Sequence, residues 1–273
     1  MTDRYAVIGN PIAHSKSPQI HAAFARLTLQ DMTYEAILAP LDGFAATVRT
    51  FIAAGGCGMN VTVPFKLEAY ALADTRSPRA EAAKAVNTLI ISPEGIRGDN
   101  TDGLGLVADL KRDLGMSLAG RRILLLGAGG AARGVLLPLL EEKPAGLYLA
   151  NRTADKARAL QAEFAAGAAA CRFEAGGFEE LSGRQFDLVI NATAASLADE
   201  APPLPDGLYA PDSLAYDMVY GRETPFLATA RTQGAARLAD GLGMLVEQAA
   251  ESFFLWRGVR PPTAPVLALL KGK

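Results

Sequence analysis

The sequence predicts an α/β protein built from two α/β domains that are separated by a cleft. Two observations predict this fold class. Short apolar runs typical of buried strands alternate with amphipathic helical patterns, and the run at 123–126 passes directly into a glycine cluster and then a helix. The chain has 273 residues, half of them hydrophobic, which is long enough for two hydrophobic cores.

The order of the expected elements follows from hydrophobic periodicity and from the turn residues between the runs. The helix at 104–114 leads out of the first domain, and alternation of strands and helices after it predicts a parallel sheet with right-handed crossovers. We expect strands at 5–10, 33–38, 58–64, 88–91, 123–126, 146–150, 170–173, 186–191 and 214–219, and helices at 17–27, 44–53, 104–114, 155–165 and after 240.

The charge distribution and the number of cysteines limit the classes of protein to which this chain can belong. The net charge is −2 with acidic and basic residues interleaved, so we expect neither a nucleic-acid-binding surface nor a segment that binds membranes. Two cysteines and two histidines, at their spacing, indicate neither a disulfide framework nor a metal site. A signal-peptide pattern and a bilayer-spanning apolar run are both lacking, so we expect a cytoplasmic protein that acts on a small molecule.

The glycine cluster is typical of a Rossmann-type, dinucleotide-binding domain. Glycines let the backbone turn sharply and approach a pyrophosphate, while the N–H groups and the dipole of the following helix supply positive potential. The alternative is a plain junction between a strand and a helix. The predicted pyrophosphate loop consists of Gly127, Ala128, Gly129, Gly130, Ala131 and Ala132.

The end of the next strand indicates which dinucleotide is bound. Asn151 stands 24 positions after Gly127, close to where NAD-binding domains carry an acidic residue for the ribose 2′-hydroxyl. Here the following residue is Arg152, whose guanidinium is suited to a 2′-phosphate, with Thr153 and Lys156 beside it. This pattern favours NADP over NAD, although a solvated surface arginine is the alternative.

Polar residues in the first domain cluster where strands end or helices begin, which is where open α/β sheets bind ligands. Each position also has a simpler explanation: the serines of the 12–17 loop and Asp102 are suited to capping helices, and Lys66 to a solvated helix start. The candidates in this domain are Ser15, Ser17, Asn60, Thr62, Lys66, Asn87 and Asp102.

Further candidates follow later strands and lie on the last helix. Thr193, Met218 and Tyr220 come at strand ends that would line the same crevice, although a methionine is more often a core residue. Gln248 lies on or beside an apolar helical stripe, where its amide needs either backbone partners or a ligand.

Seven short blocks occur in one order along the chain. They are GNPIAHSKSP at 9–18, NVTVPFK at 60–66, AVNT at 85–88, GDNTDG at 98–103, GAGGA at 127–131, NRT at 151–153 and DGLGML at 240–245. Together they resemble the NADP-dependent shikimate dehydrogenase family, whose members serve chorismate and aromatic amino-acid biosynthesis. The resemblance implies a substrate-binding domain of residues 1–103, completed by 241–273, and a Rossmann NADP-binding domain of residues 104–240.

The resemblance also implies roles for individual residues. Ser15 and Ser17 would bind the substrate carboxylate, and Lys66 and Asp102 would be the catalytic pair. The ring hydroxyls would be held by Asn60, Thr62, Asn87, Asp102 and Gln248, with Tyr220 bordering the pocket. The cofactor would contact the loop from Gly127 to Ala131, then Asn151, Arg152, Thr153 and Lys156, and also Thr193, Met218 and Gly241.

Two positions depart from the family pattern. Ala194-Ala195-Ser196 replaces a Ser-Ser-Gly or Pro-x-Gly segment, which leaves the contacts of that loop open. Lys156 stands where many relatives carry a second arginine, so we expect a weaker preference for the 2′-phosphate because lysine lacks the planar fork.

The implied reaction is the reversible reduction of 3-dehydroshikimate to shikimate. A hydride would pass between nicotinamide C4 and substrate C3, with Lys66 moving the proton on the C3 oxygen and Asp102 orienting the ammonium. Two alternatives stay open: a broader quinate/shikimate dehydrogenase that uses NAD, and a catalytically silent NADP-binding regulator on the same scaffold. The sequence is compatible with a monomer or a homodimer.

Overall fold

The structure, a computed structural model, describes residues 2–168 and 171–272, and the chain forms two compact α/β units. Unit 1 combines Met1–Gly105 with Leu245–Lys273, and unit 2 is Leu106–Met244. The α/β fold class expected from the sequence is confirmed, and the N-terminal and C-terminal segments of the chain build one domain together.

Unit 1 contains a mixed six-stranded sheet in the order β2-β1-β3-β5-β6-β4. The strands β1 (Asp3–Gly9), β2 (Met32–Leu38) and β3 (Gly56–Val61) are parallel. An antiparallel hairpin of β5 (Thr88–Ser92) and β6 (Gly95–Asp99) continues the sheet, and the short β4 (Thr75–Arg76) forms its edge. The hairpin turns at the Pro-Glu-Gly sequence of residues 93–95.

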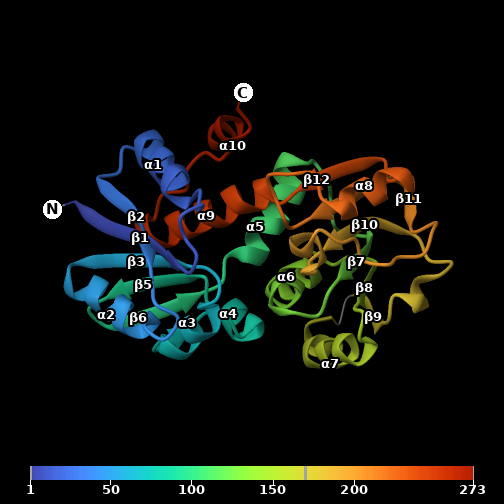
Figure 1. Ribbon diagram of the computed structural model, residues 1–273, viewed down its shortest axis with the longest axis horizontal. Coiled ribbons are helices and arrows are strands. Elements are labelled where there is room, and N and C mark those ends of the chain that lie inside the picture. Colours follow the sequence, from blue (N-terminus) through green and yellow to red (C-terminus); the bar gives the residue numbers. More distant parts are fainter. Residues whose placement is uncertain (1, 169–170, 273) are drawn as a thin grey trace. The chain divides into compact units, whose positions relative to one another are not determined.

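Helices cover both faces of this sheet (Figure 1). On one face, α2 (Phe44–Ala53), α3 (Lys66–Leu72) and α4 (Pro78–Ala83) pack around a core that includes Phe44 and Phe65. On the other, α1 (Ser17–Thr28), α9 (Leu242–Arg257) and α10 (Ala264–Leu270) enclose Phe24 and Phe253. Helix α9, from the far end of the sequence, therefore lies against strands from its beginning.

Unit 2 has a six-stranded sheet, β12-β11-β10-β7-β8-β9, in which all neighbouring strands are parallel. The central β7 is apolar throughout its interior, and Ile123 to Leu126 are fully buried, as expected for a strand covered on both faces. The strands are β7 (Arg122–Leu126), β8 (Gly146–Ala150), β9 (Arg172–Gly176), β10 (Phe186–Asn191), β11 (Tyr209–Asp217) and β12 (Arg237–Asp240).

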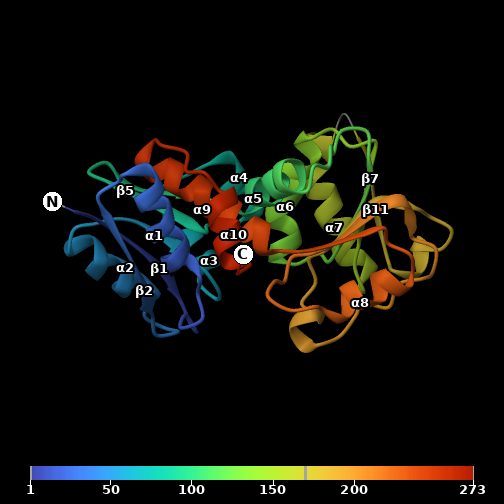
Figure 2. The ribbon, with the colours of Figure 1, turned by 90° about the horizontal axis from the view of Figure 1, so that it is seen from above.

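Chain order in unit 2 runs outward from β7 in both directions, so right-handed crossovers place the following helices on opposite faces. Helices α6 (Gly130–Glu141) and α7 (Ala154–Phe164) follow β7 and β8, whereas α8 (Pro225–Thr232) follows β11 (Figures 1 and 2). Phe226 and Leu227 of α8 pack with Leu124 and Leu126 of β7. The carboxyl ends of β7, β8 and β10 therefore meet at one edge, as the Rossmann-type prediction requires.

Several expected boundaries were wrong, each for a local reason. Strand β3 ends at Val61 rather than 64, because Phe65 N–H donates to Thr62 O (3.0 Å) and Pro64 has no N–H for a ladder. Strand β11 begins earlier than expected and stops before Met218. The short β4 and β12 were not predicted, because two to four residues carry too little alternation. For the strand expected at 170–173, residue 170 lies outside the described residues.

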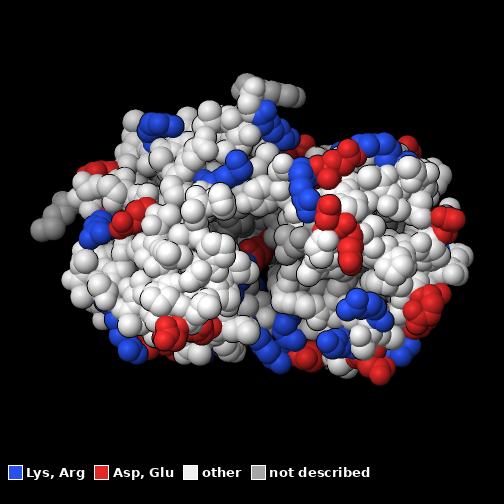
Figure 3. Space-filling view, in the orientation of Figure 1, with Lys and Arg blue, Asp and Glu red and all other residues white. Residues whose placement is uncertain are grey.

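The distribution of charged side chains on the surface agrees with the interleaved acidic and basic residues of the sequence. In the view of Figure 3, acidic and basic side chains are interspersed on each unit. In the part of the chain that the structure describes, every helix is too short or too polar to cross a membrane. Within the same residues, no group of three or more potential ligands is placed to hold a metal ion.

The helix expected at 104–114 divides into α5 (Asp102–Ala108) and a π-helical turn, Asp109–Asp113. Asp109 is 3% exposed, and its carboxylate accepts a hydrogen bond of 2.6 Å from the Tyr216 hydroxyl. A Cβ at Gly243 would lie 2.0 Å from its Oδ1, so only glycine fits there. Burial raises the pKa of Asp109 to about 7; the Tyr216 hydrogen bond opposes this shift and the nearby Asp113 carboxylate adds to it.

Asp109 predicts a pH-dependent contribution to stability. The folded protein holds this proton up to about pH 7, whereas the unfolded chain releases it near the ordinary value of 3.8, so stability falls as pH rises through that interval. An asparagine side chain at this position does not titrate, and its amide oxygen still accepts from Tyr216. We expect the melting temperature of Asp109→Asn, relative to wild type, to rise by about 5 °C between pH 5 and pH 8. If the melting temperatures of Asp109→Asn and wild type differ by the same amount at pH 5 and at pH 8, the raised pKa assigned to Asp109 is wrong.

Candidate active site

Three polar side chains of unit 1 meet around one carboxylate. Lys66, the first residue of α3, places Nζ 2.5 Å from Asp102 Oδ2, and Asn87, just before β5, donates from Nδ2 to Asp102 Oδ1 at 2.7 Å. The Lys66 and Asp102 side chains keep 31% and 20% of their surface exposed, whereas Asn87 is buried. Each carboxylate oxygen therefore has one donor, and the lysine stays accessible to a ligand.

The orientation of the Asn87 amide is determined by the backbone. Thr101 N–H donates to Asn87 Oδ1 at 2.9 Å, and because an N–H cannot accept, the Nδ2 group must face Asp102. Asn100 Oδ1 accepts from Asp102 N–H at 3.1 Å and so holds the start of α5. The segment 100–102 thus fixes both the carboxylate and the amide that donates to it.

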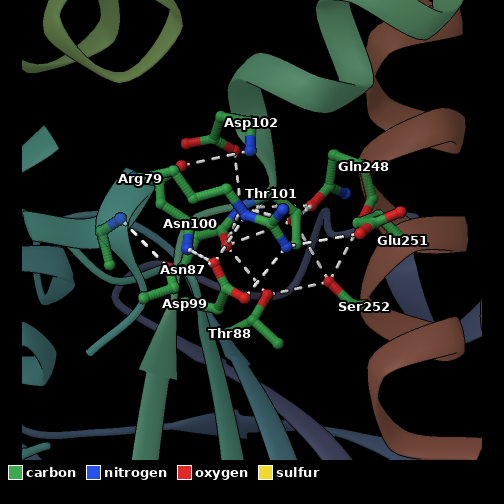
Figure 4. Close-up of polar contacts among 12 residues, drawn as sticks. Arg79, Asn87, Thr88, Asp99, Asn100, Thr101, Asp102, Gln248, Glu251 and Ser252 are labelled. Atoms are coloured by element: carbon green, nitrogen blue, oxygen red, sulfur yellow. Dashed lines mark hydrogen bonds and ion pairs between the residues drawn. The ribbon is translucent and has the colours of Figure 1, made fainter. Parts of the chain in front are cut away.

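A buried ion pair supports this segment from below (Figure 4). Arg79 of α4 binds Asp99 through two contacts, Nε–Oδ1 at 2.7 Å and Nη2–Oδ2 at 2.9 Å, and Asp99 is 1% exposed. Asp99 Oδ1 also accepts from Ser77 and from Asn100 N–H, and Glu251 of α9 contacts Arg79 at 3.3 Å. Sequence reasoning missed this pair, because a 20-residue separation between partners leaves no periodic signal.

The other candidates of unit 1 lie on neighbouring elements. Gln248 of α9 places Oε1 3.4 Å from both Asn87 Nδ2 and Thr101 Oγ1. Thr62 directly follows β3, and its methyl group packs so closely on β1 that a Cβ at Gly9 would lie 2.5 Å from it. A glycine at position 9 is therefore required for the threonine to lie there.

Neither Ser15, two residues before α1, nor Ser17, its first residue, is the N-cap. That position is taken by Lys16, whose side chain makes no capping hydrogen bond. Ser15 Oγ nevertheless accepts from the first N–H of α1, that of Ser17, at 3.3 Å. The serines therefore do not cap from the N-cap position, but Ser15 satisfies one open N–H group of the helix.

The amide of Asn60 is engaged by the protein at both its oxygen and its nitrogen. The residue is 6% exposed, its Oδ1 accepts from the Tyr34 hydroxyl at 2.7 Å, and its Nδ2 donates to Ser252 and Thr88. The pattern of the sequence placed it on the same side of a strand as Thr62, but β3 ends between them.

In unit 2, the carboxyl edge of the sheet carries a pocket of about 570 Å³, which is within the range usual for a small-molecule site. Gly127 has φ +105°, and a Cβ there would lie 3.0 Å from Ala192 O. Gly129 is the N-cap of α6, and a Cβ there or at Gly130 would meet nothing within 4 Å. The pocket is lined by the whole loop from Gly127 to Ala131, by Asn151, Arg152 and Phe178, and by residues 192–195, 198 and 200–203.

The remaining candidates of unit 2 lie at or near this edge. Arg152 is exposed on the pocket wall, Asn151 Nδ2 donates to Thr153 O at 3.0 Å, and Lys156 is exposed on the first turn of α7. Thr193 Oγ1 donates to Asn191 Oδ1 at 2.7 Å. Met218 and Tyr220 follow β11 and are half-buried, and Gly241 passes so close to Met218 that a Cβ would lie 2.2 Å from its carbonyl oxygen.

The loop that departs from the family pattern also reaches the pocket. Ala194 and Ala195 line it, and the 3₁₀ turn Ala195–Ala198 follows. The side chains that this loop presents to the pocket therefore include the methyl groups of Ala194 and Ala195, while the side chain of Ser196 lies outside the described residues.

Three family models match successive parts of the chain: a shikimate dehydrogenase substrate binding domain at residues 7–89, a shikimate/quinate 5-dehydrogenase model at 109–198, and a shikimate 5'-dehydrogenase C-terminal domain at 241–271. The shikimate dehydrogenase (NADP(+)) of Aromatoleum aromaticum is 66% identical over 98% of this chain and 97% of its own length. The chain belongs to the shikimate dehydrogenase family. The family expectation from the seven sequence blocks is confirmed.

Solved structures agree with this membership. An Ael1 enzyme from Pseudomonas putida is 52% identical with a TM-score of 0.93, covering 98% of each chain. Shikimate 5-dehydrogenase from Thermus thermophilus, solved with NADP(H) and shikimate, is 34% identical with a TM-score of 0.85, covering 99% of each chain.

The glycine loop fits a phosphate group by its own geometry. The α6 N-terminus points its first N–H groups at the pocket, its N-cap has no side chain, and the space beside Gly129 and Gly130 is open. A guanidinium, that of Arg152, lines the same pocket. These features suit a dinucleotide with a further phosphate.

The two ends of the glycine loop differ in tolerance to a side chain. Gly127→Ala places a Cβ against Ala192 O and forces alanine into a positive φ that it rarely adopts. We therefore expect the free energy of unfolding to fall by about 1–3 kcal/mol. Gly129→Ala is the matched control, because its extended backbone accepts any residue and its Cβ meets open space. Thermal melting of both variants tests this, and equal melting temperatures would refute the steric assignment.

Proposed function

We propose that this protein catalyses the reversible, NADP-dependent reduction of 3-dehydroshikimate to shikimate, as an enzyme of chorismate and aromatic amino-acid biosynthesis. The observation that carries the proposal is the Lys66–Asp102–Asn87 cluster, in which a partly exposed ammonium is held on a carboxylate whose other oxygen is also bound. A protein that only bound the cofactor would have no need of such a proton-transfer group. Composition further supports a cytoplasmic location.

NADPH, when bound, supplies the hydride for the carbonyl carbon of the substrate. The residues that would hold it are the loop Gly127–Ala131 at the pyrophosphate, Asn151, Arg152, Thr153 and Lys156 around the 2′-phosphate, Thr193 on the pocket wall, and Met218 and Gly241 near the nicotinamide. The pocket lining and the open α6 N-terminus support the first two groups.

Lys66 is the proposed proton donor to the C3 oxygen in reduction and the acceptor in oxidation. One N–H of the Lys66 ammonium is bound to Asp102, so the other two N–H groups are available to a ligand. Asp102 also has room to bind a substrate hydroxyl, because a fifth of its side chain is exposed. Which of the two is formally the base depends on how they share the proton.

The substrate is proposed to bind to side chains of unit 1. Ser15 and Ser17 would take the carboxylate, a role that their position at the N-terminal end of α1, beside its open N–H groups, supports. Thr62, Asp102 and Gln248 would hold ring hydroxyls. Asn87 would act at the same place through Asp102, because its two amide hydrogens go to Thr101 and Asp102, and the Asn60 amide is likewise engaged by protein groups.

A four-way assay tests the function: shikimate or quinate, each with NADP⁺ or NAD⁺, followed by absorbance of the reduced cofactor. The proposal predicts the highest kcat/KM for shikimate with NADP⁺. Preference for quinate and NAD⁺ would favour a broader dehydrogenase, and absence of turnover with tight NADP⁺ binding would favour a regulator. Either result would overturn the proposal.

Arg152 is expected to determine the choice of cofactor. Arg152→Asp removes a guanidinium from the pocket wall and adds repulsion to a 2′-phosphate, so we expect the ratio of kcat/KM for NADP⁺ to that for NAD⁺ to fall at least about thirtyfold. Arg121→Asp is the control, because Arg121 is exposed at the opposite end of β7. A ratio unchanged by Arg152→Asp would contradict the assignment.

A further inference from the structure

The side-chain amide of Asn60 is hydrogen-bonded both to Tyr34 of β2 and to residues of β5 and α9. On one side, its Oδ1 accepts from the Tyr34 hydroxyl of β2 at 2.7 Å. On the other, its Nδ2 donates to Ser252 Oγ of α9 at 2.9 Å and to Thr88 Oγ1 of β5 at 3.2 Å. Both hydrogens of the amide are thus occupied by protein oxygens, which leaves none for a substrate.

From there the hydrogen bonds continue to the residues around Asp102 (Figure 4). Thr88 Oγ1 donates to Asn87 Oδ1 at 2.8 Å, and Ser252 Oγ lies 3.2 Å from Thr101 Oγ1. Ser252 also donates to the Gln248 carbonyl at 3.1 Å. Ser252 is fully buried, and its hydroxyl connects α9 with β3, β5 and the segment before α5.

The hydrogen-bond donors in this chain are determined at its two amides. Asn60 donates to Ser252 and Thr88, and the Thr88 hydroxyl then lies 2.8 Å from both Asn87 Oδ1 and Ser252 Oγ, so these three side chains are directly connected. Asn87 then gives both of its hydrogens to Thr101 and Asp102. The alternative orientation of the Asn60 amide would place its oxygen against the backbone carbonyl oxygen of Asn87, which lies 3.3 Å from Nδ2 and cannot donate.

We propose that Tyr34, Asn60 and Ser252 are positioning residues, which act through Asn87 and Gln248 to hold the Asp102 carboxylate in its contact with Lys66. This inference rests on the proposed function for its kinetic consequence, but its structural consequence does not depend on the substrate. None of the three residues needs to touch the substrate in this role.

The surroundings of Tyr34 keep its hydroxyl a constant donor. Burial of the hydroxyl end raises the pKa of Tyr34 well above its ordinary value, and the Ser17 hydrogen bond only partly opposes this. The ring stacks on His21 at 4.1 Å and 7°, and burial lowers the pKa of His21 to about 3, so the stacked imidazole is uncharged. Tyr34 also connects Ser17, at the proposed carboxylate site, with Asn60.

The kinetic test uses Tyr34→Phe and Ser252→Ala, each of which removes one hydroxyl. We expect kcat/KM for shikimate to fall about tenfold in each variant, while the Kd for NADP⁺ changes less than about twofold. We further expect Tyr34→Phe to have little added effect in a chain that already carries Asn87→Ala, because the hydroxyl acts through Asn87. Multiplying effects in the double variant would overturn the proposal.

Tyr5→Phe is the matched control. Tyr5 pairs with Tyr34 across β1 and β2 and stacks on Trp256 at 4.8 Å, but its hydroxyl lies near Arg257 rather than Asn60. This variant loses a hydroxyl from the same aromatic cluster, and we expect kcat/KM within about twofold of wild type. An equal loss in Tyr5→Phe and Tyr34→Phe would show a general packing effect and would overturn the proposal.

Crystal structures of the ligand-free wild type and of Ser252→Ala test the structural consequence without any substrate. We expect the Asn87 amide or the Asp102 carboxylate to move by more than about 0.5 Å, the tolerance of a catalytic arrangement. Unchanged positions in the variant would refute the positioning role even if the enzyme turns over shikimate. Displacement in an enzyme that fails to turn over shikimate would leave the positioning role standing and reject the proposed function.

Discussion

The candidate site depends on one constraint: the carboxylate of Asp102 must present both oxygens to fixed donors and remain accessible. Lys66 and Asn87 supply the donors, and each comes from a different place in the chain, at the start of α3 and before β5. The fold must therefore bring three places in the chain to the same end of one mixed sheet: the start of α3, the residue before β5 and the start of α5. Helix α9, from the end of the sequence, completes the arrangement with Gln248 and Ser252.

Two buried networks meet this constraint. The Arg79–Asp99 pair fixes the end of β6, from which the segment 100–102 departs, and the backbone N–H of Thr101 then sets the Asn87 amide. The chain through Asn60 reaches the same amide oxygen of Asn87 through the Thr88 hydroxyl. A buried ion pair is costly to desolvate, so its value here lies in orientation rather than in stability.

Sequence reasoning predicted most of the fold because periodicity and turn residues act locally. The strands at 146–150 and 186–191 and the helix at 44–53 agree with the structure residue for residue. It missed the end of β3 at Val61, where the turn from Thr62 to Phe65 and Pro64 stop the ladder, and the π-helical turn at Asp109, whose carboxyl group binds a distant partner, Tyr216. Family resemblance singled out Lys66, Asn87 and Asp102, which lie together, but it could not separate Asn60 from them, because only side-chain direction does so.

The central claim is that Lys66 and Asp102 act as one unit, and a double-mutant cycle on kcat/KM for shikimate measures this most directly. Lys66→Met, Asp102→Asn and the double variant are compared with wild type. The account predicts that the double variant is within about threefold of the slower single variant, because either change already breaks the unit. Losses that multiply in the double variant would show that the two residues act independently and would contradict the account.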